Sequence, residues 1–399
     1  MDDLNLYLKR FLQDLTVRRV DDLSGPSKRA SVAVVIRLRA PFPSSSSGDE
    51  PRNTSLSHRR SARKNPYGVC HAGEIEDVFE QPWVKDATAE ILFIKRSSRV
   101  GDRWTGHVAL PGGGRDKTDE GDEVTAVREC MEEVGLDLTS EDALLCGALP
   151  QRVIITNWGQ KPLMVLCPYV FLWTKETIPP FKLQASEVAA AFWIPINFLL
   201  DGNHRTQHPV NVSDRMASST SQLLKPLFNV LLGPMYFSAV HLKPEEVHGT
   251  IQDDSASETD KARGMGDLML WGITYAVLAD MLDFLPPFNF VESFQYPFFG
   301  GWDFKLFAWI LSRGYRRSRK EDLMEYKFSD VIGMRPVSGG RKPQPRQEAR
   351  VSIIDYLIKG YYGFVRRAAY ATVLLRVVAF GLIIRYLLQT NLIGRLHSS

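Results

Sequence analysis

Three glutamates, Glu129, Glu132 and Glu133, follow the spacing i, i+3 and i+4 in the stretch 128–136 (RECMEEVGL). On a helix this spacing places all three carboxylates on one face. Like charges this close repel one another, so the face is unfavourable unless a cation binds to it. Mg²⁺ and Mn²⁺ take oxygen ligands and leave coordination positions open for water and substrate phosphates. The spacing therefore predicts a divalent metal site.

The residues around these glutamates are suited to shaping such a site. Arg128 can bind a neighbouring carboxylate through two hydrogen bonds and fix its direction. The glycine run 112–114 allows a tight backbone bend before the helix. We expect Glu120 to return over this loop toward Arg128 or the metal, as a further ligand. The helix itself is predicted over 124–134, with Gly135 as its C-cap.

Short apolar runs and periodic stretches indicate the elements that position this helix. Helices are predicted over 1–24 and 267–285, and a further helix begins at Ser186. The predicted strands are 31–38, 90–95, 107–110, 152–156 and 163–173. Strands interspersed with helices favour an α/β or α+β fold, in which a mixed sheet is sandwiched between helices.

The complete pattern joins Gly114, Glu120 and the stretch 128–136 at fixed separations, and it is identified as a Nudix box. The chain thus resembles the Nudix hydrolase superfamily. The resemblance implies a loop–helix–loop box beside a mixed sheet, and water attack on a phosphorus atom of a diphosphate. It also implies Mg²⁺ or Mn²⁺ as cofactor. Cys130 stands where the family prefers a larger aliphatic residue, and we expect it to face the sheet.

The stretch 92–113 is similar to the motif that precedes the box in coenzyme A diphosphatases. The matching residues are Arg96, Ser97, Arg103, Gly106, Pro111, Gly112 and Gly113. Leu110 departs from the expected Phe, and the stretch from Ser97 to Gly106 is one residue longer. The resemblance extends to 186–200 and 271–278. It implies coenzyme A or an acyl-coenzyme A as substrate, with 4′-phosphopantetheine and adenosine 3′,5′-bisphosphate as products.

The resemblance and the chemistry of phosphate binding together select the candidate site residues. Arginine forms two parallel hydrogen bonds to phosphate oxygens, so arginines near the loop are candidate substrate ligands. The candidate substrate-binding residues are Arg96, Arg103, Gly112, Gly113 and Gly114. The candidate metal ligands are Glu120, Glu129, Glu132 and Glu133. The candidate catalytic residues are Arg128, Glu129, Glu132, Glu133 and Glu187. Two interpretations of Glu187 are open: a base or further metal ligand, or a carboxylate that only stabilises the N-terminus of a helix through the helix dipole.

Two other functions remain open, and a third kind of partner is disfavoured. A diphosphatase for a dinucleotide or nucleotide sugar needs the same box. A non-catalytic, membrane-bound Nudix ligand sensor would not need the intact set of Glu129, Glu132 and Glu133. A net charge of +3, and the lack in the core of the chain of a basic patch interleaved with aromatics, argue against a nucleic acid partner.

Cysteine usage and the chain ends favour an intracellular protein. The four cysteines form no C-x-x-C pair, so we expect buried thiols in a reducing compartment rather than a zinc site. The acidic start at Asp2 and Asp3 does not resemble a signal peptide, and residues 396–399 are not a peroxisomal tripeptide address.

The chain divides into an N-terminal helical segment (1–30), a Nudix domain (31–285, with a disordered insertion at 44–65) and an aromatic, apolar C-terminal region (286–399). Residues 368–388 are long enough to span a bilayer. A central arginine, Arg376, costs about 2.5–3.5 kcal/mol there, whereas each Leu, Ile or Val returns only about 0.3–0.6 kcal/mol. Membrane association and a buried helix packed on 287–312 are therefore both open. Membrane association predicts that a chain ending near 345 stays soluble and active.

Overall fold

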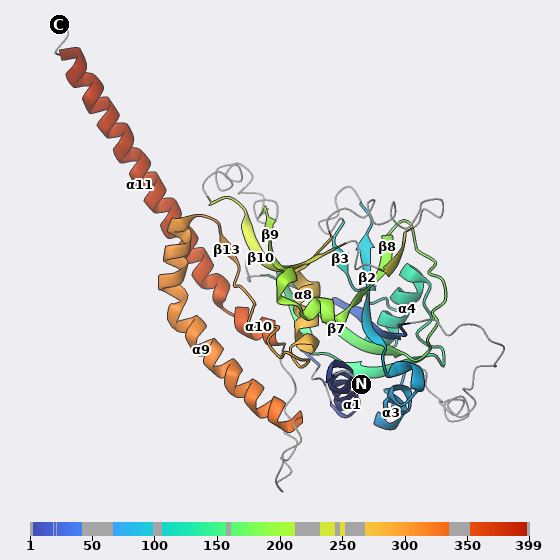
Figure 1. Cartoon of the computed structure of the whole chain (residues 1–399). Coiled ribbons are helices and arrows are strands. Elements are labelled where there is room, and N and C mark those ends of the chain that lie inside the picture. The colour runs from blue at the N-terminus through green and yellow to red at the C-terminus, as the bar shows by residue number, and fades with distance from the viewer. Residues whose placement is uncertain are drawn as a thin grey trace.

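We describe a computed structural model of the chain (Figure 1). The structure describes residues 3–18, 20, 22–41, 67–98, 106–156, 161–211, 232–243, 248–251, 268–334 and 352–396. The insertion predicted at 44–65 and the candidate ligand Arg103 lie outside these residues.

A large mixed sheet forms the centre of the described part of the chain. Its main strands run in the order β11 (His248–Ile251), β8 (Val188–Pro195), β2 (Thr88–Arg96), β1 (Arg29–Arg39), β7 (Lys161–Trp173) and β5 (Ala143–Ala148). Three short strands join its edges and ends: β3 (Val108–Ala109), β4 (Gly112–Gly114) and β6 (Arg152–Thr156). The β1–β7 pair is parallel, and the other pairs are antiparallel.

Helices cover both faces of this sheet, because successive side chains of its buried strands point to opposite sides. On β1, Ala33 and Val35 pack with helix α4 (Asp122–Val134), whereas Val34 and Ile36 face the other hydrophobic cluster. That second cluster includes residues of α1 (Asp3–Val17), α3 (Ala72–Phe79), α5 (Ile196–Leu200) and α8 (Gly272–Leu282). The predicted mixed sheet between helices is confirmed.

A smaller sheet lies beside the larger one. It runs in the order β12 (Leu268–Trp271), β10 (Met235–Leu242) and β13 (Phe298–Phe299), and β9 (Arg205–Val210) also pairs with β10. The remaining short elements are the 3₁₀ turns η1 (Pro82–Val84) and η2 (Gly202–His204).

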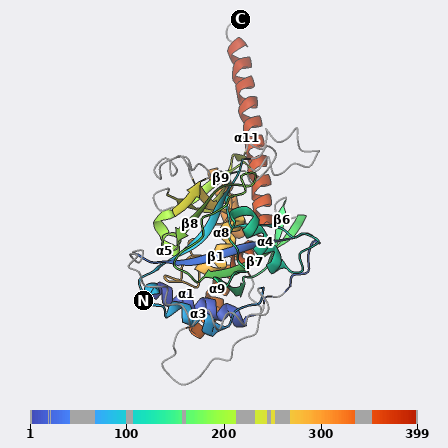
Figure 2. The same cartoon turned by 90° about the vertical axis from the view of Figure 1, so that its right-hand side faces the viewer.

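Three helices make up most of the described C-terminal region: α9 (Trp302–Met334), α10 (Ile353–Ile358) and α11 (Tyr361–Leu396). The inner residues of α10 belong to the main core, since Ile353 and Leu357 lie in the same buried cluster as Leu8 and Phe11. Helices α9 and α11 pack mostly in another cluster, which includes Phe304 and Val365. The outer part of α11 leaves the body of the molecule and projects away from it (Figures 1 and 2).

A buried polar network ties α10 to the large sheet. Arg152 of β6 forms an ion pair with Asp280 of α8, and both side chains are at most 2% exposed. Arg152 Nη2 donates to Ser352 Oγ at 2.8 Å, and the Ile353 amide donates to Asp280 Oδ1 at 2.8 Å. Residues on both sides of position 286 therefore share one core.

The helix predicted to begin at Ser186 is wrong. Residues 185–187 form a turn, and β8 follows directly from Val188. The run VAAAFWIP is buried between β2 and β11, and a strand covered on both faces reads as a continuous apolar run rather than an alternating one. Tertiary burial outweighs the helical preference of the alanines.

Candidate active site

Helix α4 carries the glutamate cluster and is defined by glycines at both ends. Gly121 is its N-cap, and Gly135 ends it in the left-handed region at φ 72°, which a residue without a side chain adopts at no cost. Ala126, Cys130 and Val134 are buried against the sheet. The expectation that Cys130 acts as a small buried apolar residue is confirmed. This packing turns the glutamates toward the glycine loop.

The glycine loop touches two of the glutamates. The Gly112 amide donates to Glu133 Oε2 at 2.8 Å. A Cβ atom at Gly113 would lie 2.5 Å from the Glu129 carboxylate, and one at Gly112 (φ +153°) would lie 2.3 Å from the backbone oxygen of Ser31. A side chain at either position would therefore collide with the site or with β1.

Glu133 is the most deeply buried carboxylate of the cluster, with 1% of its surface exposed. The pKa of Glu133 is raised to about 8, mainly by burial and also by the neighbouring carboxylates of Glu129 and Glu187, while the Gly112 amide and Arg96 oppose the shift. Burial also raises the pKa of Glu129. These effects place Glu129, Glu133, Glu187 and Arg96 in one electrostatic neighbourhood, where negative charge is strongly disfavoured.

Arg128 organises the outer side of the cluster. Its Nε and Nη2 atoms donate to the two carboxylate oxygens of Asp119 at 3.0 and 2.9 Å, and Nη2 also donates to the Gly114 carbonyl at 3.0 Å. Its Nη1 atom lies 3.1 Å from Glu129 Oε1 and 3.0 Å from Glu132 Oε2. The Arg128 hydrogen bonds hold the pKa of Asp119 at about 2.

The structure places Asp119, rather than Glu120, on Arg128. The Glu120 side chain is exposed, and the residue contributes its backbone carbonyl, which accepts from Arg115 Nη2 at 3.0 Å. Thr125 Oγ1 and the Asp116 amide both donate to Asp119 Oδ2 at 2.9 Å. Asp119 was not among the residues selected from the sequence. The signal that could have indicated it is an acid shortly before the start of α4, followed six residues later by Thr125.

The pairing of β2 with β8 brings the remaining candidates to the cluster. Arg96 ends β2 and lies opposite Val188 at the start of β8, directly after Glu187. The Ser97 amide donates to the Glu187 carbonyl at 2.8 Å, which fixes this junction. Glu132, by contrast, is on the solvent side, with its side chain 52% exposed. The site thus has a buried glutamate, Glu133, a half-buried one, Glu129, and an exposed third.

The model of the NUDIX domain family matches residues 83–212, which include the glycine loop, α4 and β8. Residues 83–212 are therefore a Nudix domain. The match spans the glutamate cluster and the β2–β8 junction, so the geometry described above is that of a Nudix box and its neighbouring strands.

Relatives of this Nudix domain come from several eukaryotes. The chain is 36% identical over 228 residues to an uncharacterized protein of Schizosaccharomyces pombe, a match that covers 57% of this chain and 66% of the relative. It is 30% identical to the chloroplastic Nudix hydrolase 22 of Arabidopsis thaliana, over 46% of this chain and 61% of the relative. It is 37% identical to a peroxisomal coenzyme A diphosphatase of Caenorhabditis elegans, over 29% of this chain and 47% of the relative. The chain thus spans about half to two thirds of the length of these relatives.

The donor set of the Nudix box suits a hard divalent cation. Within the described ranges, no three His, Cys, Asp or Glu side chains are already arranged as a complete metal site. Glu133 is nevertheless buried beside the half-buried Glu129, and the pKa values of both are raised, which is a charge conflict that a cation relieves. The residues therefore fit Mg²⁺ or Mn²⁺.

Proposed function

We propose that this chain is a metal-dependent Nudix diphosphatase that hydrolyses the diphosphate of coenzyme A or an acyl-coenzyme A. The products are 4′-phosphopantetheine, acylated where the substrate is, and adenosine 3′,5′-bisphosphate. The observation that carries the proposal is the pair of the half-buried Glu129 and the buried Glu133, held against the glycine loop with Arg96 and Glu187 beside it. The name of the Caenorhabditis elegans relative supports the substrate class.

Glu129, Glu132 and Glu133 are the proposed metal ligands, with Glu120 as a further one. A bound Mg²⁺ or Mn²⁺ supplies an activated water and neutralises charge on the phosphoryl oxygens. The protein holds the ligands in place: the Gly112 amide fixes Glu133, and Arg128 fixes Glu129 and Glu132. Asp119 in turn fixes the plane of the Arg128 guanidinium.

The other side chains of the site are proposed to bind the substrate and to accept a proton. Arg96 and Arg103 are proposed to bind substrate phosphates, since guanidinium groups match phosphate oxygens in pairs. The loop 112–114 has no side chains, so the substrate can approach its backbone closely. Glu187 is proposed to take the proton of the attacking water.

The chain's chemistry agrees with an intracellular location for this activity. All four cysteines, Cys70, Cys130, Cys146 and Cys167, are buried and free. Free buried thiols are typical of a reducing compartment. One relative is named as peroxisomal.

The metal requirement is tested with the full chain by removing and restoring the cation. Activity should vanish with EDTA and return with Mg²⁺ or Mn²⁺. Glu132→Gln and Glu133→Gln should each lower kcat by roughly 10²-fold or more, because each removes a carboxylate that holds the cation. Glu80→Gln, which changes an exposed acid after α3, is the matched control and should have no effect. Full activity in excess EDTA refutes the metal mechanism.

The substrate class is tested by a panel with product masses. Coenzyme A should be cleaved better than dephospho-coenzyme A, since the latter lacks the 3′-phosphate. Arg103→Ala and Arg96→Ala should narrow this difference, each lost charge-assisted hydrogen bond costing about 1.5–3 kcal/mol. Equal rates on the two substrates, or higher rates on nucleotide sugars, would favour another nucleoside-diphosphate conjugate as the substrate.

A further inference from the structure

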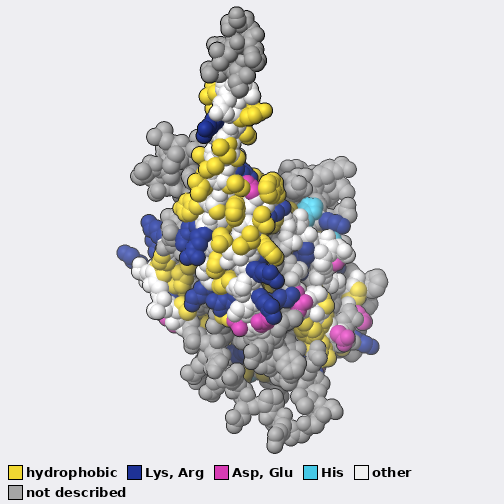
Figure 3. Space-filling model, turned by 90° about the vertical axis from the view of Figure 1, so that its left-hand side faces the viewer, with side chains coloured by type: hydrophobic (Ala, Val, Ile, Leu, Met, Phe, Trp, Pro, Cys, Tyr) yellow, Lys and Arg dark blue, Asp and Glu magenta, His cyan; other side chains and the backbone are white. Residues whose placement is uncertain are grey.

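The outer part of α11 is an apolar helix that nothing in the described structure covers. The segment Tyr361–Thr390 is long and apolar enough to cross a membrane by length and composition. Beyond Arg376 its large apolar side chains are exposed all round the helix: Val377, Val378, Phe380, Leu382, Ile383, Ile384, Leu387 and Leu388. A helix that is apolar on every side belongs in a protein core or in a bilayer. Figure 3 shows these side chains as a column that continues onto the body of the molecule.

Helix α9 extends this apolar surface. Trp302, Leu306, Trp309 and Ile310 are between 47% and 75% exposed, and their spacing of i, i+4, i+7 and i+8 places them on one stripe of the helix. Lys305 lies at the edge of the stripe, with its ammonium group over the ring of Phe298 at 5.1 Å. If α11 inserts into a bilayer, this apolar stripe of α9 lies beside it in the near leaflet.

The two helices are antiparallel, and their pairing sets the level of each residue. Asp303 pairs with Arg376, and twelve residues further along α9, the Tyr315 ring contacts the Phe364 ring in a tilted arrangement, with the ring centres 5.3 Å apart. From the first pair to the second, the contact moves twelve residues forward on α9 and twelve residues back on α11. In this register Trp309 of α9 lies level with Tyr370 of α11. Tryptophan and tyrosine at one level are typical of the interface between lipid tails and water.

A basic band lies directly below these aromatic residues. It consists of Arg313, Arg316, Arg317, Arg319, Lys320, Arg366 and Arg367. By the same offset Arg313 is level with Arg366, and the Arg313 guanidinium lies 5.2 Å from the ring of Trp309. Lys and Arg side chains flank the apolar column in Figure 3. Such a band complements the anionic headgroups of a lipid surface.

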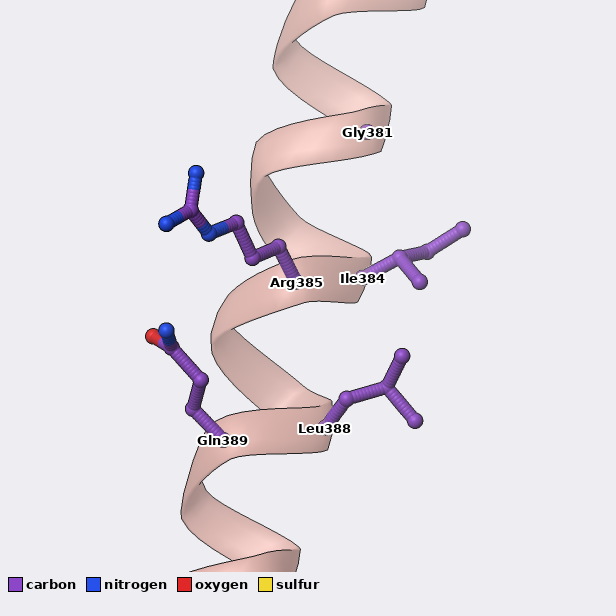
Figure 4. A pocket seen from close by; sticks show the side chains of 5 residues that line it. All are labelled: Gly381, Ile384, Arg385, Leu388 and Gln389. Atoms are coloured by element: carbon purple, nitrogen blue, oxygen red, sulfur yellow. The ribbon is translucent and has the colours of Figure 1, made fainter.

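The length of α11 above this band matches a bilayer. From Tyr370 to Gln389 the helix rises about 30 Å, which is the thickness of the hydrocarbon core. Figure 4 shows Arg385 and Gln389 on one side of the helix and Ile384 and Leu388 on the other. Arg385 lies about 22 Å beyond Tyr370, so its long side chain can reach the far headgroups.

Arg376 is the charge that most opposes insertion, and the structure neutralises it. Its Nε and Nη2 atoms each donate to one carboxylate oxygen of Asp303 at 2.6 Å. The Asp303 side chain is 6% exposed, and that of Arg376 is 32% exposed. The two charges cancel within one pair of helices, so α11 can enter lipid without an isolated arginine.

We propose that α9 and α11 form a membrane-binding unit, in which α11 inserts into an anionic bilayer from Tyr370 onward and the Asp303–Arg376 pair supplies the charge neutrality that insertion requires. The apolar stripe of α9 then lies in the near leaflet, and the basic band lies at the headgroups. This proposal does not depend on the substrate of the Nudix domain.

Membrane binding is tested with the full chain in vesicles of phosphatidylcholine and phosphatidylserine. The chain should float with the vesicles on a density gradient and remain with them after washing at alkaline pH. Ile310→Asp should weaken binding, whereas Ile155→Asp, which changes a similarly exposed isoleucine on β6, outside α9 and α11, should not. Recovery of the full chain in the soluble fraction without detergent, including as a soluble dimer that covers α11, overturns the proposal.

The ion pair is tested by a cycle of substitutions. Asp303→Asn leaves Arg376 unpaired and should reduce the vesicle-bound amount about tenfold or more. Adding Arg376→Leu to that variant should restore binding, which a merely misfolded protein would not do. Glu321→Gln removes the acidic partner of Arg317 in an exposed pair on α9, at 2.8 Å, and is the matched control. Equal binding of Asp303→Asn and the wild type overturns the role of the pair.

Discussion

Replacing Asp119 by Asn should destabilise the protein by about 2 kcal/mol at pH 7. The Arg128 hydrogen bonds lower the pKa of Asp119 from 3.8 to about 2, and a pKa unit corresponds to about 1.36 kcal/mol. The Asp119 side chain is 3% exposed, so solvent screens the interaction little. The amide of Asn cannot receive both guanidinium hydrogen bonds as a carboxylate does.

The pH dependence of this effect has a definite sign. The folded-state pKa is depressed, so the stabilisation is complete above the unfolded value of 3.8 and is lost as the pH falls toward 2. The difference between wild type and Asp119→Asn should therefore be full at pH 5 and about half as large at pH 3.

This difference is measured by urea unfolding of the wild type and Asp119→Asn in the same detergent, followed by far-ultraviolet circular dichroism. Glu120→Gln is the matched control, because Glu120 is the exposed neighbour, and it should change the free energy of unfolding by less than about 0.5 kcal/mol. A loss below about 0.5 kcal/mol for Asp119→Asn, or an equal loss for Glu120→Gln, would refute the assignment of Asp119 as the anchor of Arg128.

Three further outcomes follow from the structure. Gly112→Ala should cost about 1–3 kcal/mol in a thermal unfolding assay, because its φ of +153° and the adjacent backbone exclude a Cβ atom. Gly114→Ala, which meets nothing within 4 Å, should be neutral. Because burial raises the pKa of Glu133 to about 8, Mn²⁺ must displace its proton, so calorimetry should show about tenfold weaker binding for each pH unit below 8. A chain ending at 345 should give little soluble protein, contrary to the sequence-based expectation, because it loses Ile353 from the core and the Ser352 partner of Arg152; a yield and melting temperature equal to those of the full chain would contradict this.

The parts of the structure with a local signal could be predicted from the sequence. The helix predicted over 124–134 is α4, because it has a periodic apolar face and ends at Gly135. The strand predicted over 31–38 is β1, because that run is rich in β-branched residues. The burial of Cys130 follows from its place on the apolar side of that helix. Spacing alone was enough to bring Glu129 and Glu133 together.

The parts that depend on distant partners could not be predicted. Asp119 becomes the anchor of Arg128 only through the path of the loop, which no periodicity encodes. β8 is a strand because β2 and β11 cover its edges. The partner of Arg376 is Asp303, which is 73 residues away in the sequence, so a hydropathy pattern counts the arginine as an uncompensated charge.

The hydrogen bond from Arg152 to Ser352 joins residues 200 positions apart, and this separation affects how the protein folds during synthesis. At about 5–20 residues per second, Ser352 is made about 10–40 s after Arg152. Once α8 has been made, the nascent chain has the complete Nudix box and the strands of the large sheet but not yet the segment around Ser352, so Arg152 and the apolar surface around α8 stay open. Folding is therefore completed late, and chaperones that bind exposed apolar segments have this interval in which to act.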